Sequence, residues 1–252
     1  SREESINFHY DGKPLAPGAT YFWCVRVWDR HDQPSPWSAP QSFTISATPA
    51  PQAPSRYPAH PHRQPAAKFT AISTKHYFID FAQAAFGWLE LTLESDHEAT
   101  VEILLGEHTV DQRVELNPGG TIRSAQVTLQ LRAGRHHYRI ETPPDQRNTE
   151  EPLAIRLPKE FGIVMPFRYA EIIGYSGSLG AEDATQTRLE YPFEETASAF
   201  SSSDPGLDQI WEFCKYSIRA TTFCGVYVDG DRERIPYEAD AFINQLGHYA
   251  VD

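Results

Sequence analysis

Apolar and polar residues alternate along much of the chain between residues 67 and 190. A period of two residues is typical of half-buried strands, and the runs that show it lie at 77–81, 87–93, 99–104, 125–131, 137–140 and 167–173. Glycine turns at 117–120 and 133–134 separate some of these runs. The pattern predicts an antiparallel, jelly-roll-like β-sandwich over residues 67–190.

One segment of this region breaks the alternation. Residues 142–158 are rich in proline and charge and predict a mobile loop insertion. Two roles are open to the sandwich itself, a scaffold for a neighbouring domain or a sugar-binding face of its own. The scaffold is favoured, because a fold by itself does not define a site.

A second β-rich region covers residues 5–46, with alternating runs at 5–10 and 21–28. It resembles the second half of a fibronectin type III sandwich in the order of Leu15, Pro17, Gly18, Tyr21, Val25, Val27, Trp37 and Phe43. Such a sandwich needs about seven strands over about 100 residues. We therefore expect residues 1–47 to form a partial module and the chain to begin inside a domain.

The stretch between the two β regions, residues 48–66, is rich in proline and polar residues and predicts an extended linker. It contains His60 and His62. An isolated pair of histidines in such a segment is more often solvated than metal-bound, so no metal site is assigned to it.

After residue 191 the period becomes that of a helix. Asp204 is a suitable N-cap and Pro205 suits the first helical position. An apolar helix face follows at Leu207, Ile210, Trp211, Cys214 and Ile218. A second helix is predicted by the spacing of Ala241, Phe242, Leu246 and Tyr249. This pattern reaches the last residue without a capping signal, so we expect residues 191–252 to be the truncated start of a larger helical domain.

Composition excludes some classes of function. The formal net charge of −12, without a stripe of Lys and Arg, argues against nucleic acid and suits a neutral ligand. No apolar run is long enough to span a membrane. Cys24, Cys214 and Cys224 show no metal or disulfide spacing and are expected to be buried free thiols. No metal or cofactor is predicted, and the compartment and oligomeric state stay open.

The segment between the two predicted helices holds the densest group of ionisable residues. Residues 229–240 contain five carboxylates and two arginines around one tyrosine. Crowded carboxylates in a concave site raise one another's pKa, and a pocket retains a protonated acid at neutral pH in this way. A solvated, salt-bridged surface loop is the alternative. Calcium is disfavoured, because the spacing is not that of an EF-hand and the arginines oppose a cation.

The chain contains, in order, a fibronectin-like module, a β-sandwich, a helix that starts at Ser-Ser-Asp-Pro (202–205) with Ile210 and Trp211, and the acidic segment. This order resembles that of the bacterial α-L-rhamnosidases of glycoside hydrolase family 78. The family loop reads Asp-Cys-Pro-x-Arg-x-Glu-Arg-Leu-Gly-Trp-x-x-Asp and opens an (α/α)6 toroid. The resemblance implies that Glu233 is the general acid and that Arg234 is the arginine after it. Tyr237 stands for the tryptophan of the sugar pocket and offers a ring face to a 6-deoxy sugar.

The same resemblance implies that Asp229 and Asp240 are the bracketing carboxylates that bind sugar hydroxyls. The loop is two residues shorter than the family's between Asp229 and Glu233, and Gly230 replaces the family's cysteine. Arg232 is assigned to substrate binding together with Arg234. No ligand for a metal is implied.

The expected function is the inverting hydrolysis of terminal α-L-rhamnosyl or related deoxy-sugar linkages in an oligosaccharide or glycoside. Inversion needs an acid and a second carboxylate that activates water. The family's general base comes from the far half of the toroid, so this chain is expected to carry the general-acid half of the site and to be inactive alone. The alternatives are a toroid hydrolase for another sugar and a non-catalytic carbohydrate-binding β-sandwich module.

Overall fold

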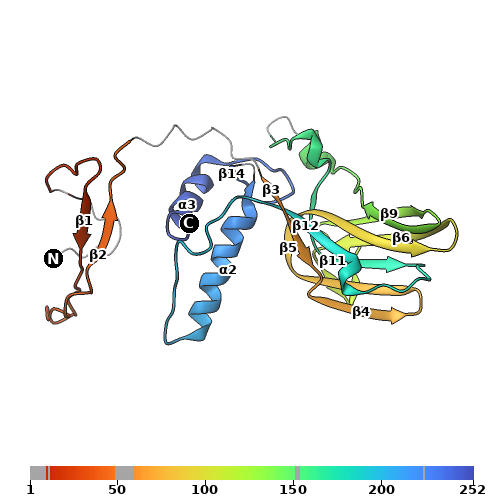
Figure 1. Cartoon of the computed structure of the whole chain (residues 1–252), viewed down its shortest axis with the longest axis horizontal. Helices are drawn as coiled ribbons and strands as arrows, with labels where there is room; N and C mark the ends of the chain where they lie inside the picture. Colours follow the sequence, from red (N-terminus) through yellow and green to blue (C-terminus); the bar gives the residue numbers. More distant parts are fainter. Residues whose placement is uncertain (1–9, 11, 49–58, 151–153, 224) are drawn as a thin grey trace. The chain divides into compact units, whose positions relative to one another are not determined.

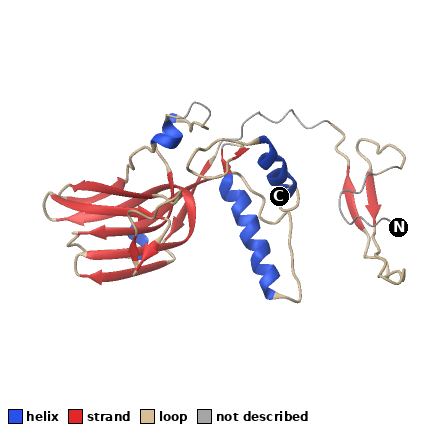
Figure 2. Cartoon of the chain, turned by 180° about the vertical axis from the view of Figure 1, so that it is seen from behind, coloured by secondary structure: helices blue, strands red, loops and turns tan. Residues whose placement is uncertain are grey.

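The computed structural model describes residues 10, 12–48, 59–150, 154–223 and 225–252. The chain divides into two compact units, residues 1–54 and residues 55–252, and each is described by itself. Strands are the main secondary structure, and two long helices lie near the C-terminus (Figures 1 and 2). The predicted fold class, mainly β with a C-terminal α part, is confirmed.

The first unit is built on two antiparallel strands, β1 (Thr20–Trp23) and β2 (Gln41–Thr44). The strand predicted over 21–28 ends at Trp23. Beyond it, the backbone N–H groups of Val25 and Val27 donate to the hydroxyls of Ser38 and Ser35 at 3.0 and 3.1 Å. The N–H groups of the same serines donate back to the Val25 and Val27 carbonyls at 2.8 Å, so the segments are joined by both side-chain and backbone bonds. The run predicted at 5–10 falls almost entirely on residues outside the described part of the chain.

The second unit contains one sheet with the strand order β3-β12-β5-β11-β6-β9, in which β4 and β10 also pair with β5. Its strands are β3 (His60–Pro65), β4 (Lys68–Ser73), β5 (His76–Ser95), β6 (Ala99–Gly106), β9 (Ser124–Leu131), β10 (Gly134–Arg139), β11 (Met165–Ile173) and β12 (Ala184–Glu190). Two short strands, β7 (Thr109–Val110) and β8 (Arg113–Val114), form a separate pair.

Strand β5 pairs with four other strands of this unit, and it contains both strands predicted at 77–81 and 87–93. Its first half pairs with β4 and β11, and its second half pairs with β10 and β12. Between the halves, Ala82 adopts a left-handed backbone with φ 68°, and its N–H donates to Asp80 at 2.7 Å. Arg168 holds the same carboxylate at 2.7 and 2.9 Å. Both halves place their odd-numbered residues in one buried core with Val101, Ile103, Leu105, Phe167, Ala170 and Ile172.

The linker predicted over 48–66 is wrong for its last residues. His60–Pro65 form β3, which pairs with β12 at the edge of the sheet. Proline is tolerated in an edge strand, where its missing N–H interrupts no ladder on the open side. Both histidines of β3 are exposed.

The helices are α1 (Gln146–Thr149), α2 (Pro205–Thr221) and α3 (Glu238–His248), with 3₁₀ turns at Lys159–Phe161 and Ala181–Asp183. Helix α2 begins where the sequence predicts: the Asp204 side chain accepts from the N–H of Gly206 at 2.8 Å. Within the described residues, no helix combines the length and the apolar character needed to cross a membrane. No group of three potential metal ligands occurs among those residues either.

The expected burial of the cysteines is wrong at both positions that the structure describes. Cys214 lies on the apolar face of α2 and is exposed, as is Ile210. Cys24 follows the end of β1 and is exposed too. The opposite side of α2 faces the sandwich, where Lys215 is buried and the Tyr216 hydroxyl donates to the carbonyl of Ala84. Cys224 lies outside the described residues.

A substitution of Gly87 tests how closely the paired strands β5 and β12 must approach each other. A Cβ atom at this position would overlap the backbone carbonyl oxygen of Thr187, which cannot move without breaking the strand pairing. We expect Gly87→Ala to lower the free energy of unfolding by about 1–3 kcal/mol or more, as overpacking does. Urea denaturation measures the loss.

Gly106→Ala is the matched control. In β6 the one close contact of the added methyl is a side-chain atom of Val114, at 2.7 Å, and a side chain can shift more readily than a paired backbone. The loss should therefore be smaller than for Gly87→Ala. Equal losses would show that the close approach of β5 and β12 does not limit the packing.

Candidate active site

The acidic loop, residues 228–237, joins a short hairpin to helix α3. The hairpin consists of β13 (Thr222–Phe223) and β14 (Val226–Tyr227) and directly follows α2. Phe223 and Val228 are almost fully buried and belong to an apolar cluster with Phe86, Trp88 and Val164 of the sandwich. The rings of Phe86 and Phe223 are 4.9 Å apart. The start of the loop is thus fixed to the sandwich by apolar packing.

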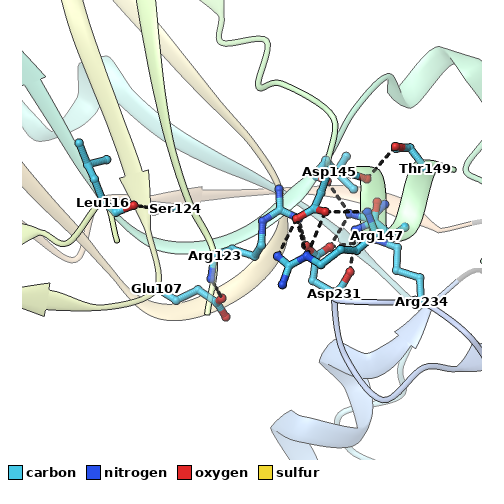
Figure 3. Close-up of polar contacts among 11 residues, drawn as sticks. Glu107, Leu116, Arg123, Ser124, Asp145, Arg147, Thr149, Asp231 and Arg234 are labelled. Carbon is cyan, nitrogen blue, oxygen red and sulfur yellow. Dashed lines mark hydrogen bonds and ion pairs between the residues drawn. The ribbon is translucent and has the colours of Figure 1, made fainter. Parts of the chain in front are cut away.

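Two charged residues of the loop point inward and pair with each other. The Nε and Nη2 atoms of Arg234 donate to Asp231 Oδ1 at 2.9 and 2.5 Å (Figure 3). Nη2 also donates to the carbonyl of Val164 at 2.6 Å. The guanidinium lies over the rings of Phe86 and Phe223. Arg234 has a left-handed backbone, with φ 53°. The predicted substrate-binding residue Arg234 is therefore buried and engaged in holding the loop.

Three other predicted site residues meet on the outer side of the loop. The Tyr237 hydroxyl donates to Glu233 Oε2, and Arg232 Nη2 forms an ion pair with Glu233 Oε1. The side chains of Glu233 and Arg232 are 23% and 48% exposed. Both oxygens of the predicted general acid thus have a partner, and both partners come from the loop itself.

Asp229 is electrostatically coupled to this group. Its partial burial raises the pKa of its carboxyl, and the neighbouring negative charge of Glu233 raises that pKa further. The hydrogen bond to Glu233 likewise raises the pKa of the Tyr237 hydroxyl. Asp240 lies in the first turn of α3, where a negative charge favours the helix dipole, and is exposed. Its charge contributes weakly to the raised pKa of Asp229.

A cavity of about 510 Å³ lies between one part of the loop and the sandwich. Asp229 and Arg232 line it on the loop side, and Glu107, Ile122 and Pro166 line it on the sandwich side. Burial raises the pKa of the Glu107 carboxyl, and the charge of Asp231 adds to that effect. A hollow with an apolar wall and a few polar groups has the character of a small-molecule site.

The sandwich residues that contact the loop carry almost no signal in the sequence. Arg123 pairs with Asp231, and the side chain of Asn148 donates to the backbone oxygen of Asp231 at 2.6 Å. Asn148 lies in α1, inside the segment 142–158 that was predicted to be a loop insertion. The one available signal was Asp145, which follows two prolines and caps α1 by accepting from the N–H of Arg147. Arg123 carried no local signal.

The shifted carboxyl of Asp229 predicts a pH-dependent stability. A carboxyl whose pKa is raised by folding destabilises the folded state once it ionises, so this penalty grows as pH rises above the unfolded pKa. Asp229→Asn should therefore gain melting temperature relative to wild type between pH 4 and pH 7, by a small amount because the residue is largely exposed. Thermal unfolding at several pH values measures this difference.

Asp80→Asn should change the stability in the opposite direction. The hydrogen bond from Arg168 lowers the pKa of Asp80, so its stabilisation is present at neutral pH and is lost as pH falls. This variant should lose stability at pH 7, and the loss should shrink toward acid pH. If both variants changed stability in the same direction at pH 7, the raised pKa of the Asp229 carboxyl would be contradicted.

Both ends of the chain match models of known protein families. Residues 1–48 match the family model of the Rha78A-like, N-terminal immunoglobulin domain, a β-sandwich architecture that fibronectin type III domains share. Residues 195–252 match the model of the bacterial alpha-L-rhamnosidase 6 hairpin glycosidase domain. A curated alpha-L-rhamnosidase of Streptomyces avermitilis is 50% identical over 38 residues, which are 15% of this chain and 4% of that protein.

Solved structures share the fold. The alpha-L-rhamnosidase from Dictyoglumus thermophilum has a TM-score of 0.55 and 17% identity, over 77% of this chain and 21% of that one. The Streptomyces avermitilis alpha-L-rhamnosidase complexed with L-rhamnose has a TM-score of 0.50 and 18% identity, over 79% of this chain and 18% of that one. The chain thus spans about a fifth of the solved relatives it matches. Both ends of the chain match family models of α-L-rhamnosidase domains, and the resemblance that the sequence predicts is confirmed.

Proposed function

We propose that residues 195–252 supply the general-acid half of an inverting glycosidase that cleaves terminal α-L-rhamnosyl or related deoxy-sugar linkages. The family matches support an α-L-rhamnosidase-like glycoside hydrolase. The stereochemical course, the sugar and the role of each residue are our proposal. We also keep the division into a fibronectin-like module (1–47), a sandwich (67–190) and a helical domain (191–252), with β3 added to the sandwich.

One observation carries the assignment of the acid. The acidic loop separates its charges into a buried pair, Asp231 with Arg234, and an accessible group that contains Glu233. A general acid must reach the leaving oxygen of a substrate while its carboxyl stays oriented. Glu233 meets both conditions, because it is partly exposed and the Tyr237 hydroxyl fixes one of its oxygens.

The proposed chemistry follows from this arrangement. When Arg232 leaves Oε1, Glu233 takes up a proton from solvent at that oxygen. It then donates this proton to the glycosidic oxygen as the bond to the sugar breaks, and the leaving oxygen occupies the former place of Arg232. A second carboxylate, about 6.5–9.5 Å away in inverting enzymes, activates a water on the opposite face of the ring. Asp229 and Asp240 accept hydrogen bonds from sugar hydroxyls, and the Tyr237 ring packs on the apolar side of the sugar.

The resemblance implies that Arg234 binds substrate, and we propose another role for it. Its guanidinium lies over two aromatic rings, and its Nε and Nη2 atoms are bonded within the protein, so we propose that it holds the loop and that Arg232 contacts the substrate. Since the chain spans about a fifth of its solved relatives, we place the general base outside these residues. The 252 residues alone are then expected to be inactive.

Substitution of Glu233 tests the acid role. In the full-length protein, Glu233→Gln should slow hydrolysis of a rhamnosyl disaccharide by about 10²-fold or more, since its leaving group needs a proton. An aryl α-L-rhamnoside such as the 4-nitrophenyl glycoside should lose much less, because its leaving group departs without full protonation. Steady-state kinetics on both substrates give the comparison.

Glu238→Gln is the matched control, because Glu238 is an exposed carboxylate only five residues further along. It should leave the ratio of the two rates unchanged. Equal losses for both substrates in Glu233→Gln would remove Glu233 from the acid role. Glycan binding by the wild-type protein without any hydrolysis would instead support the carbohydrate-binding module.

The stereochemical course is a separate prediction. Direct displacement by water inverts the anomeric centre, so the first sugar released from an α-L-rhamnoside should be the β anomer. Proton NMR during the first minutes of hydrolysis distinguishes the anomers before mutarotation mixes them. Initial release of the α anomer would indicate a retaining mechanism with a covalent intermediate.

A further inference from the structure

Arg123 connects the sandwich to the acidic loop. It stands directly before strand β9 and is separated from Asp231 by 108 residues of sequence. Its Nη1 atom pairs with Asp231 Oδ2 and lies 3.0 Å from Asp145 Oδ2 (Figure 3). The side chains of Arg123 and Asp231 are 7% and 2% exposed. The contact is therefore a buried pair of opposite charges.

Asp231 is held from both sides. Its Oδ1 atom accepts from Arg234, while its Oδ2 atom pairs with Arg123. Each arginine occupies one carboxylate oxygen, so the carboxylate cannot rotate without breaking a buried charge-assisted contact. Asp145 shares Arg123 with Asp231 and is itself bonded by Arg147 at 2.6 Å. Its charge and that of Asp231 together offset the two buried arginines.

The sandwich also holds the backbone of the loop at two points. The Asn148 side chain in α1 donates to the backbone oxygen of Asp231 at 2.6 Å. The N–H of Ile155 donates to the backbone oxygen of Arg234 at 2.9 Å. Residues 231 and 234 are thus fixed by groups from outside the loop, and only Arg232 and Glu233 lie between them.

We propose that Arg123 is a positioning residue that acts through Asp231 to set the location of Glu233. This inference rests on the proposed function and assigns the sandwich a part in the reaction. A buried ion pair adds little to stability compared with apolar packing of the same volume, whereas it does fix geometry. A general acid displaced by about 1 Å loses much of its rate.

The test uses Arg123→Met in the full-length protein. We expect kcat for a rhamnosyl disaccharide to fall by about 10²-fold, with a smaller loss for 4-nitrophenyl α-L-rhamnoside and little change in KM. Arg123→Lys should recover part of the rate, because an ammonium reaches one of the two carboxylates but not both. Arg135→Met, which removes an exposed ion pair with Asp183, is the control and should leave the rates unchanged.

A double variant separates positioning from a general loss of structure. In a Glu233→Gln background, Arg123→Met should have little further effect on the disaccharide, because both changes remove the same contribution. A purely structural role of Arg123 would instead give equal losses for both substrates and losses that multiply in the double variant. Either of these results would overturn the inference.

Two further measurements cover the remaining outcomes. If Arg123→Met does not fold, Asn148→Ala removes only the hydrogen bond to the Asp231 backbone and should show the same dependence on leaving group. Amide hydrogen exchange of residues 229–237 should rise in either variant, whether or not the wild type hydrolyses rhamnosides. Wild-type inactivity on both substrates would contradict the proposed function, whereas an active wild type with unchanged variants would contradict only the role of Arg123.

Discussion

The carboxylate of Asp231 is the interaction on which the arrangement of the site depends. It is buried between Arg123 of the sandwich and Arg234 of its own loop, and each arginine binds a different oxygen. A buried carboxylate without such partners would carry a large desolvation penalty. The loop can therefore adopt its observed conformation only when it is docked on the sandwich. The sandwich is for this reason a structural part of the site.

Two aromatic rings pack against the buried ion pair of Asp231 and Arg234. Phe86 and Phe223 pack against each other and carry the Arg234 guanidinium on their rings. Apolar packing keeps water away from the Asp231 pairs, and charge-assisted bonds are stronger where water is excluded. The outer part of the loop has no such cover, so Glu233 and Arg232 remain accessible. The same ten residues thus combine a rigid inner side with an open outer side.

Local patterns in the sequence account for the parts that it predicts correctly. The strands of the sandwich follow from alternation, and the start of α2 follows from Asp204 and Pro205. What the sequence could not reveal depends on distant partners. Strand β12 buries Gln186, Thr187 and Arg188, so alternation of apolar residues does not mark it, and its partner β3 is rich in proline. No local pattern in the sequence indicates the pairing of Arg123 with Asp231 either.

The 108-residue separation of Arg123 and Asp231 has a consequence for the order of folding. Contacts between distant parts of a chain form only after the entropy of closing the intervening loop has been overcome. Domains generally fold as units, from the N-terminal side first, as the chain is synthesised. Residues 60–190, which form the sandwich and include Arg123, are synthesised before residues 229–237. We therefore expect the sandwich to fold first and to provide the surface on which the acidic loop then docks.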